Sequence, residues 1–195
     1  MTVIKDGTGQ GFLAGVAKNN RLFVDAVTIP EIAFHSLEEG TAFQLEGEAL
    51  ITAATETTVL IIINDESEKL ISIERFLVSI QGESGKITTI KAYIGNATVS
   101  GGTTKSLVNL NTTSVQTLSV TARENVAPAS IGGTDSRIQE NYMELTETIE
   151  FLYIGAIILG RLGSFRVTCT GAAGAAGTKN CDASFLLFNV DPAEH

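Results

Sequence analysis

The sequence predicts an all-β protein: an antiparallel, jelly-roll-like β-sandwich preceded by an extended N-terminal arm that folds back as a hairpin. Apolar and polar residues alternate with the two-residue period of a half-buried strand. Glycine is abundant, with 19 residues, and proline is scarce, with 3. Turn-forming stretches separate short apolar runs, a spacing typical of a sandwich or jelly roll, at residues 38–40, 64–68, 82–85, 100–104 and 131–135.

The N-terminal residues predict a hairpin of their own. Gly7, Gly9 and Gly11 form a flexible lead-in, and then two apolar stretches, 12–16 and 21–27, flank an Asn-Asn pair that tolerates a left-handed turn. An isolated two-stranded hairpin is marginally stable, so this one must lie on its own sandwich or on a partner. We favour a docking arm, with partner-binding residues Phe12, Leu13, Val16, Leu22, Phe23 and Val24.

Pro30 separates this arm, residues 1–30, from the expected sandwich, residues 31–195. Strict alternation predicts strands over 89–94, 117–121 and 163–170. Residues 59–63 and 185–188 are apolar on both sides, which predicts strands buried on both faces or covered by a neighbouring subunit.

Composition excludes several classes of function. The net charge of −9 argues against nucleic acid as a partner, because neutralising phosphates needs clustered lysine and arginine. No secretory signal is visible in the first residues, and the longest apolar runs are far too short to span a bilayer, so no membrane partner is expected. A hydrophobic content of 44% is sufficient for a sizeable core.

Motifs for catalysis are scarce, and we expect no enzyme. The glycine-rich stretch at 7–11 lacks the Gly-Lys-Ser/Thr ending of a phosphate loop, and His35 and His195 are the two histidines, with no Gly-x-Ser-x-Gly elbow. Glu144, Glu147 and Glu150 could serve a glycosidase, but tryptophan is absent and no aromatic sugar platform accompanies them. No catalytic or cofactor-binding residue is therefore assigned.

A metal site is not expected either. Residues 64–68 gather oxygen ligands of the kind that calcium prefers, but they lack the spacing of an EF-hand, and a solvated turn is the favoured interpretation. The two cysteines and two histidines are too scattered for zinc. Cys169 ends one predicted strand and Cys181 opens the next, so they could face each other across a hairpin, either as a disulfide or as two buried thiols.

The opening segment VIKDGTGQGFLAGV at 3–16, followed by NNRL at 19–22, resembles the start of a family of tailed-bacteriophage virion structural proteins. Further similar segments, at residues 43–50, 56–64, 108–111, 119–122, 132–134 and 156–167, extend the resemblance along most of the chain. The chain departs from this family in its loop at 171–177 and in its two cysteines.

The resemblance implies a jelly-roll-like virion component that forms a homo-oligomer, a trimer by analogy. Its expected role is capsid decoration: a cement protein that binds the major capsid protein and its own copies, assembled in the bacterial cytoplasm and located in the virion. Two alternatives stay open. One is a host-binding adhesin or fibre head, and the other is a neck or baseplate component.

Overall fold

The computed structural model of the chain describes residues 15–16, 22–23, 39–51, 54–81, 88–143, 148–171 and 179–190. The chain forms two compact units, Met1–Glu31 and Ile32–His195. In the first unit, β1 (Gly15–Val16) and β2 (Leu22–Phe23) pair antiparallel, with Val16 opposite Leu22. These residues therefore form the two-stranded ladder of the hairpin predicted around the Asn-Asn pair.

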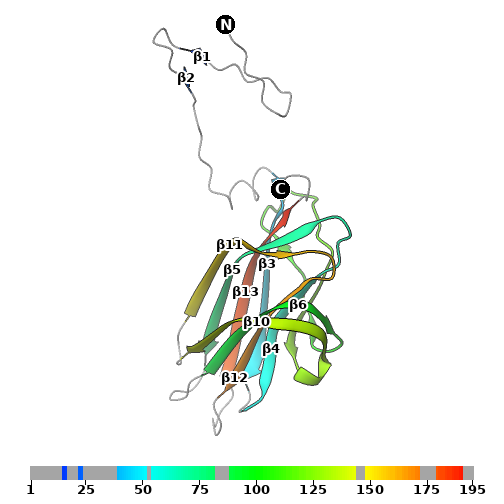
Figure 1. Ribbon diagram of the computed structural model, residues 1–195, viewed down its shortest axis with the longest axis vertical. Helices are drawn as coiled ribbons and strands as arrows, with labels where there is room; N and C mark the ends of the chain where they lie inside the picture. The colour runs from blue at the N-terminus through cyan, green and yellow to red at the C-terminus, as the bar shows by residue number, and fades with distance from the viewer. Residues whose placement is uncertain are drawn as a thin grey trace. The chain divides into compact units, whose positions relative to one another are not determined.

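The second unit is an all-β sandwich of two antiparallel sheets, as the sequence predicted (Figure 1). The six-stranded sheet has the order β10 (Ile131–Met143), β6 (Thr88–Val99), β12 (Ser164–Gly171), β4 (Glu56–Asn64), β9 (Val120–Val126) and β7 (Thr103–Thr104). The five-stranded sheet has the order β11 (Thr148–Leu159), β5 (Leu70–Gln81), β13 (Lys179–Val190), β3 (Ala42–Ile51) and β8 (Val108–Asn109). A short 3-10 turn, η2 (Pro128–Ser130), leads into β10.

The path of the chain is that of a jelly roll. The strands β3, β4, β5 and β6 alternate between the two sheets, and so do β10, β11, β12 and β13. The one long connection within a sheet joins β6 to β10, which pair with each other. Such a winding of eight strands into two four-stranded layers defines the jelly-roll architecture. The strands β7, β8 and β9 lie between β6 and β10 in the sequence. They extend each sheet at the edge away from β10 and β11: β9 and β7 next to β4, and β8 next to β3.

Phenylalanine side chains from both sheets meet in the core. Phe165 of β12 and Phe185 of β13 have ring centroids 5.1 Å apart, and Phe76 of β5 contacts both rings. Phe151 of β11 stacks on Phe76 at 4.3 Å. Aromatic pairs in these geometries add stabilisation beyond the burial of their apolar area. These ring contacts therefore pack β12 of the six-stranded sheet against β5 and β13 of the five-stranded sheet.

The chain itself covers the doubly apolar strand predicted at 59–63. Leu60 and Ile62 face the main core, whereas Ile61 and Ile63 point to the other side and pack with Val126 in a smaller cluster. Every residue of β4 after Glu56 is buried. Of the two alternatives for this strand, burial on both faces within one chain is correct.

Two predicted boundaries were wrong. The strand expected at 117–121 begins only at Val120. Residues 131–135, expected as a turn, lie within β10, because Gly133 (φ +77°) lets the edge strand approach β6 closely: a β-carbon there would lie 2.3 Å from the carbonyl oxygen of Asn96.

Among the described residues, the structure has no helix whose length and hydropathy would let it span a bilayer.

Candidate functional site

A network of charged side chains crosses the outer face of the six-stranded sheet and is centred on Arg166 of β12. Because Phe165 and Val167 point into the core, Arg166 between them points outward. Its guanidinium carbon lies 4.0 Å from the centroid of the Tyr93 ring, the residue directly opposite on β6. This position allows a cation–π contact. Residues of the two flanking strands, β10 and β4, complete what we call the Arg166 network.

The guanidinium is held by hydrogen bonds and charge from both sides. Its Nε donates to Asp135 of β10, whereas Nη1 lies 3.4 Å from the Thr58 hydroxyl and 3.8 Å from a Glu56 carboxylate oxygen of β4. The side chain of Arg166 is 12% exposed and that of Asp135 is 15% exposed. A charge so well covered must be paired to be tolerated.

Glu56 links this centre to a second cation. It accepts hydrogen bonds from the Lys91 ammonium and from the Tyr93 hydroxyl, both at 3.0 Å. Burial of the Glu56 carboxylate raises its pKa, but these hydrogen bonds outweigh burial and hold the pKa below its usual range. The same bond to Glu56 raises the pKa of Lys91, and burial raises that of Tyr93. The hydrogen bond between Glu56 and Lys91 therefore favours the charged form of both side chains.

Next to the network lies a hollow of about 270 Å³, lined by Glu56, Thr58, Asp135, Arg166 and residues of η2 and early β10. Its charged groups already bind one another, so they are poorly placed to bind an ionic ligand strongly. Its described lining residues provide no nucleophile beside a general base, the arrangement that covalent catalysis needs. The arrangement is suited to holding four strands in register.

A second hollow, of about 430 Å³, lies beside the outer face of the five-stranded sheet and is acidic. It is lined by Glu46, Glu48 and Asp182, with Glu124 and Lys105 at one side. Lys105 and Glu124 form an ion pair at 3.2 Å, and Glu124 also accepts the backbone N–H of Glu48 at 2.9 Å. Burial raises the pKa of Asp182. In the part of the chain that the structure describes, no three His, Cys, Asp or Glu side chains are grouped to hold a metal ion.

The two cysteines face each other between the sheets and not across a hairpin. Cys169 lies on β12 and Cys181 on β13, and these strands belong to different sheets. The hairpin expected between these strands was therefore wrong, because the chain crosses from one layer to the other between β12 and β13. Both thiols are fully buried and free. Their side chains are in hydrogen-bond contact, and this contact together with burial raises the pKa of Cys181 well above its usual range.

The acidic stretch at 64–68 is a turn whose side chains hydrogen-bond to neighbouring segments. Asn64 is fully buried, and its amide donates to the carbonyls of Lys69 and Leu159. The next two side chains accept hydrogen bonds from the start of β9 and the residue before it: Asp65 from the Thr121 hydroxyl at 2.8 Å and Glu66 from the backbone N–H of Ser119 at 2.7 Å. These carboxylates stabilise a loop, so a turn is a sufficient account of them.

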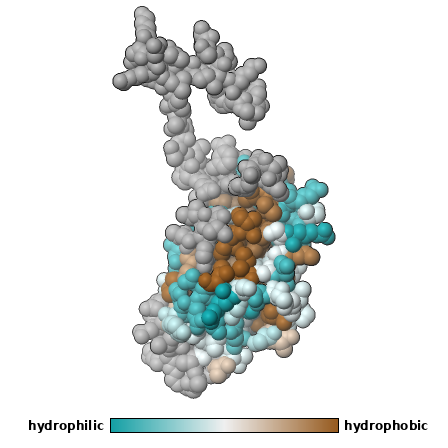
Figure 2. Space-filling view, in the orientation of Figure 1, coloured by the Kyte–Doolittle hydropathy of each residue, from teal (hydrophilic) through white to brown (hydrophobic). Residues whose placement is uncertain are grey.

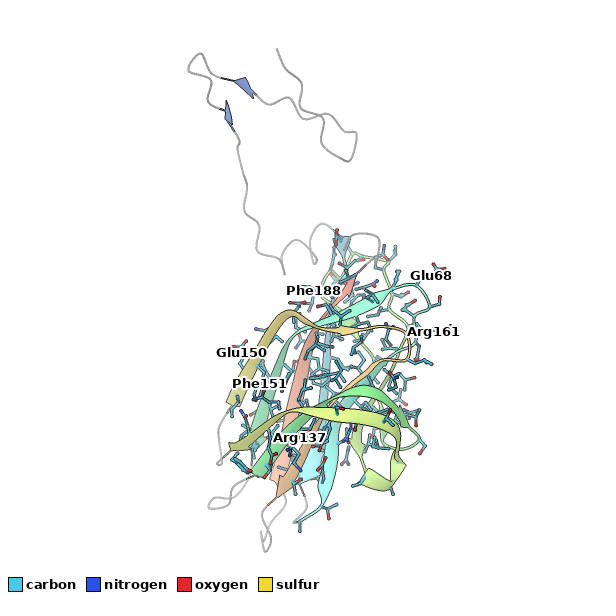
Figure 3. All side chains as sticks on the ribbon, in the orientation of Figure 1. Glu68, Arg137, Glu150, Phe151, Arg161 and Phe188 are labelled. Carbon is cyan, nitrogen blue, oxygen red and sulfur yellow. The ribbon has the colours of Figure 1, made fainter. Side chains whose placement is uncertain are left out.

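Asn64 also joins this turn to the β11–β12 loop, since its backbone carbonyl accepts the N–H of Leu162 at 2.8 Å. Figure 3 shows Glu68 and Arg161, one from each of the two loops, at the same end of the sandwich.

The structure describes four of the other candidates from the sequence and leaves the rest outside the described residues. Glu150 lies on β11 and forms a surface ion pair with Arg75 at 3.2 Å, where both side chains are more than a third exposed (Figure 3). Val16, Leu22 and Phe23 lie on β1 and β2. The remaining candidates lie outside the described residues: Phe12, Leu13, Val24, His35, Glu144, Glu147 and His195.

The Arg166 network was not predicted from the sequence. The alternation of 163–170 placed Arg166 on the outer face, and that of 89–94 placed Lys91 between inward-facing residues. The contacts of the network, however, depend on how four strands that are distant in sequence pair with one another. A lone arginine between two core residues of a strand is the signal that could have pointed to it.

Comparison of the chain with protein-family models, with curated proteins and with solved structures finds no match.

Proposed function

We propose that the chain is a non-enzymatic structural protein of a bacteriophage particle, a capsid decoration (cement) protein that binds the major capsid protein and copies of itself. The observation that carries this proposal is the jelly-roll winding of its eight long strands. Jelly rolls recur in viral capsid proteins, and also in lectins and cupins. Because a fold alone does not determine function, the opening motif that resembles virion proteins supports the choice among them.

The charges described above support a structural role more than a catalytic one. The Arg166 network is paired within itself, and Asp65 and Glu66 of the 64–68 turn bind a hydroxyl and a backbone N–H group. A cement protein acts by mass action: it binds the assembled shell better than the unassembled subunits, and so shifts the equilibrium towards the shell. Many modest contacts suffice, since symmetric display multiplies them.

Mass spectrometry of purified particles with copy-number determination tests the proposal. A cement protein is expected in hundreds of copies per particle. The heads of particles that lack it should disassemble at a lower temperature than those of complete particles. A dozen or fewer copies would place the chain in the neck, baseplate or fibre instead. Its absence from purified particles would overturn the virion role altogether.

A further inference from the structure

The two sides of the sandwich end in very different edge strands. On one side the sheets end in β7 and β8, each of two residues, whereas on the other side they end in β10, of 13 residues, and β11, of 12 residues. Among the described strands, β10 pairs only with β6. Its other edge presents backbone N–H and C=O groups that can pair with a further strand.

The side chains of β10 are largely uncovered. Tyr142 is 67% exposed, Ile138 is 41% exposed, and the side chain of Arg137 is 51% exposed. Figure 2 shows hydrophilic atoms gathered in the region where Figure 1 draws β10, with an apolar patch above them. A long edge strand with free backbone groups and exposed side chains is a template on which a strand of another chain can pair.

A β-bulge determines which side chains of β10 share a face. The register against β6 shifts between Arg137 and Gln139, so that Ile138 is an extra residue. As a result Arg137 and Glu140 lie on the same face and form an ion pair, and the Tyr142 hydroxyl donates to Glu140 at 3.2 Å.

The residues between these belong to the other face. The Gln139 amide donates to Asn141 at 2.9 Å, and Met143, in the same alternation, is buried. Before the bulge in the sequence, Asp135 lies on the outer face of the sheet and accepts a hydrogen bond from Arg166.

We propose that the β10 strands of two copies pair antiparallel about a two-fold axis between Ile138 and Gln139, which joins their six-stranded sheets into one. In this register Arg137 lies opposite Glu140 of the partner subunit, and Glu140 lies opposite Arg137 of the partner subunit. Opposite charges at directly opposed positions stabilise an antiparallel pair, whereas like charges destabilise it. The strand is therefore complementary in charge to a second copy of itself.

The proposed register also satisfies the alternation of faces. It places Asp135 opposite the partner's Tyr142, both outward, and Ser136 opposite the partner's Asn141, both on the other face. A shift by one residue would oppose outward to inward side chains. The bulges of the two copies meet at the axis, so the pairing is interrupted only there. Such an isologous contact is the commonest way in which soluble chains form dimers.

This inference does not depend on the virion role. The two-fold contact joins copies in pairs, and so differs from the trimer that the resemblance to virion proteins implies.

The charge pair allows a test by complementation. Arg137→Glu places two acidic side chains opposite each other, and Glu140→Arg places two basic ones opposite each other, so each variant alone should dimerise about tenfold more weakly than the wild type. In an equal mixture of the two variants, both opposed pairs again carry opposite charges. Sedimentation velocity should therefore show that the mixture dimerises as the wild type does, at a concentration where each variant alone is mostly monomeric.

Two controls accompany the test. The double variant Arg137→Glu/Glu140→Arg restores both opposed pairs and should dimerise like the wild type. Arg75→Glu makes the same charge change at the surface pair with Glu150 and should leave dimerisation unchanged. Thermal unfolding shows that each variant is folded. A wild type that stays monomeric or trimeric, single variants that dimerise like the wild type, or a mixture that stays monomeric would each overturn the proposal.

Discussion

The guanidinium of Arg166 lies over the Tyr93 ring, with 4.0 Å between the guanidinium carbon and the ring centroid. The two residues are directly opposed on neighbouring antiparallel strands, so the contact follows from the register of β12 and β6. Asp135 on the next strand and Glu56 on the strand beyond β12 extend the contact across four strands. A single arginine thus connects most of the six-stranded sheet on its outer face.

Arg166→Ala should therefore destabilise the sandwich more than an ordinary surface substitution. The change removes the contact with Tyr93 and leaves the largely covered carboxylate of Asp135 without its cation. We expect a loss of about 1–3 kcal/mol in the free energy of unfolding, measured by urea denaturation. The matched control is Arg75→Ala, whose ion pair with Glu150 is exposed and should contribute less than about 1 kcal/mol. Equal effects of the two substitutions would contradict a special role of Arg166.

The lowered pKa of Glu56 predicts a dependence of stability on pH. Hydrogen bonds from Lys91 and Tyr93 outweigh burial and hold the folded-state pKa below the ordinary value of 4.5. The stability that Glu56 contributes is thus fully present above pH 4.5 and is lost as the pH falls through the lower, folded-state pKa. The melting temperature of the wild type should exceed that of Glu56→Gln at neutral pH, and this gap should close in acid. A gap that stays constant down to pH 2 would contradict the assignment.

The burial of both cysteines predicts thiols that do not react in the folded protein. Cys169 and Cys181 have no exposed surface, so a disulfide reagent cannot reach either thiol. Contact with Cys169 together with burial also raises the pKa of Cys181, which disfavours the reactive thiolate of that residue. Under non-reducing conditions, two thiols per chain should be modified quickly in denaturant and slowly without it. Fast modification of the native protein would show that the thiols are accessible. No modification in denaturant would show that they had formed a disulfide.

The sequence was sufficient for the architecture because alternation is a local property. Phe165, Val167 and Cys169 point into the core as predicted, since each is two residues from the next along one strand. The hairpin expected between Cys169 and Cys181 was wrong because a local pattern cannot tell a hairpin from a connection that crosses between layers. The Arg166 network was missed for the same reason, since it depends on which strands pair. Gly132 and Gly133 were misread as a turn, although glycine serves equally in a closely packed edge strand.

The arm over residues 1–30 gives the last prediction: its removal should abolish attachment to the particle and leave the sandwich folded. Among the described residues, β1 and β2 pair Gly15 with Phe23 and Val16 with Leu22, and a two-stranded hairpin is at best marginally stable in water by itself. Burying a large apolar side chain contributes about 1.5–3 kcal/mol, so the apolar residues of the arm favour a covered position.

The truncated chain, beginning after Pro30, should be compared with the full chain by thermal unfolding and by binding to capsids that lack the protein. A docking arm predicts an unchanged melting temperature and lost binding. A sharply lowered melting temperature would instead assign the arm to the fold of its own sandwich. If the truncated chain binds capsids as the full chain does, the docking role is wrong. The double substitution Leu22→Asp/Phe23→Asp, which keeps the chain length, should reproduce the loss of binding if apolar burial on the partner causes attachment.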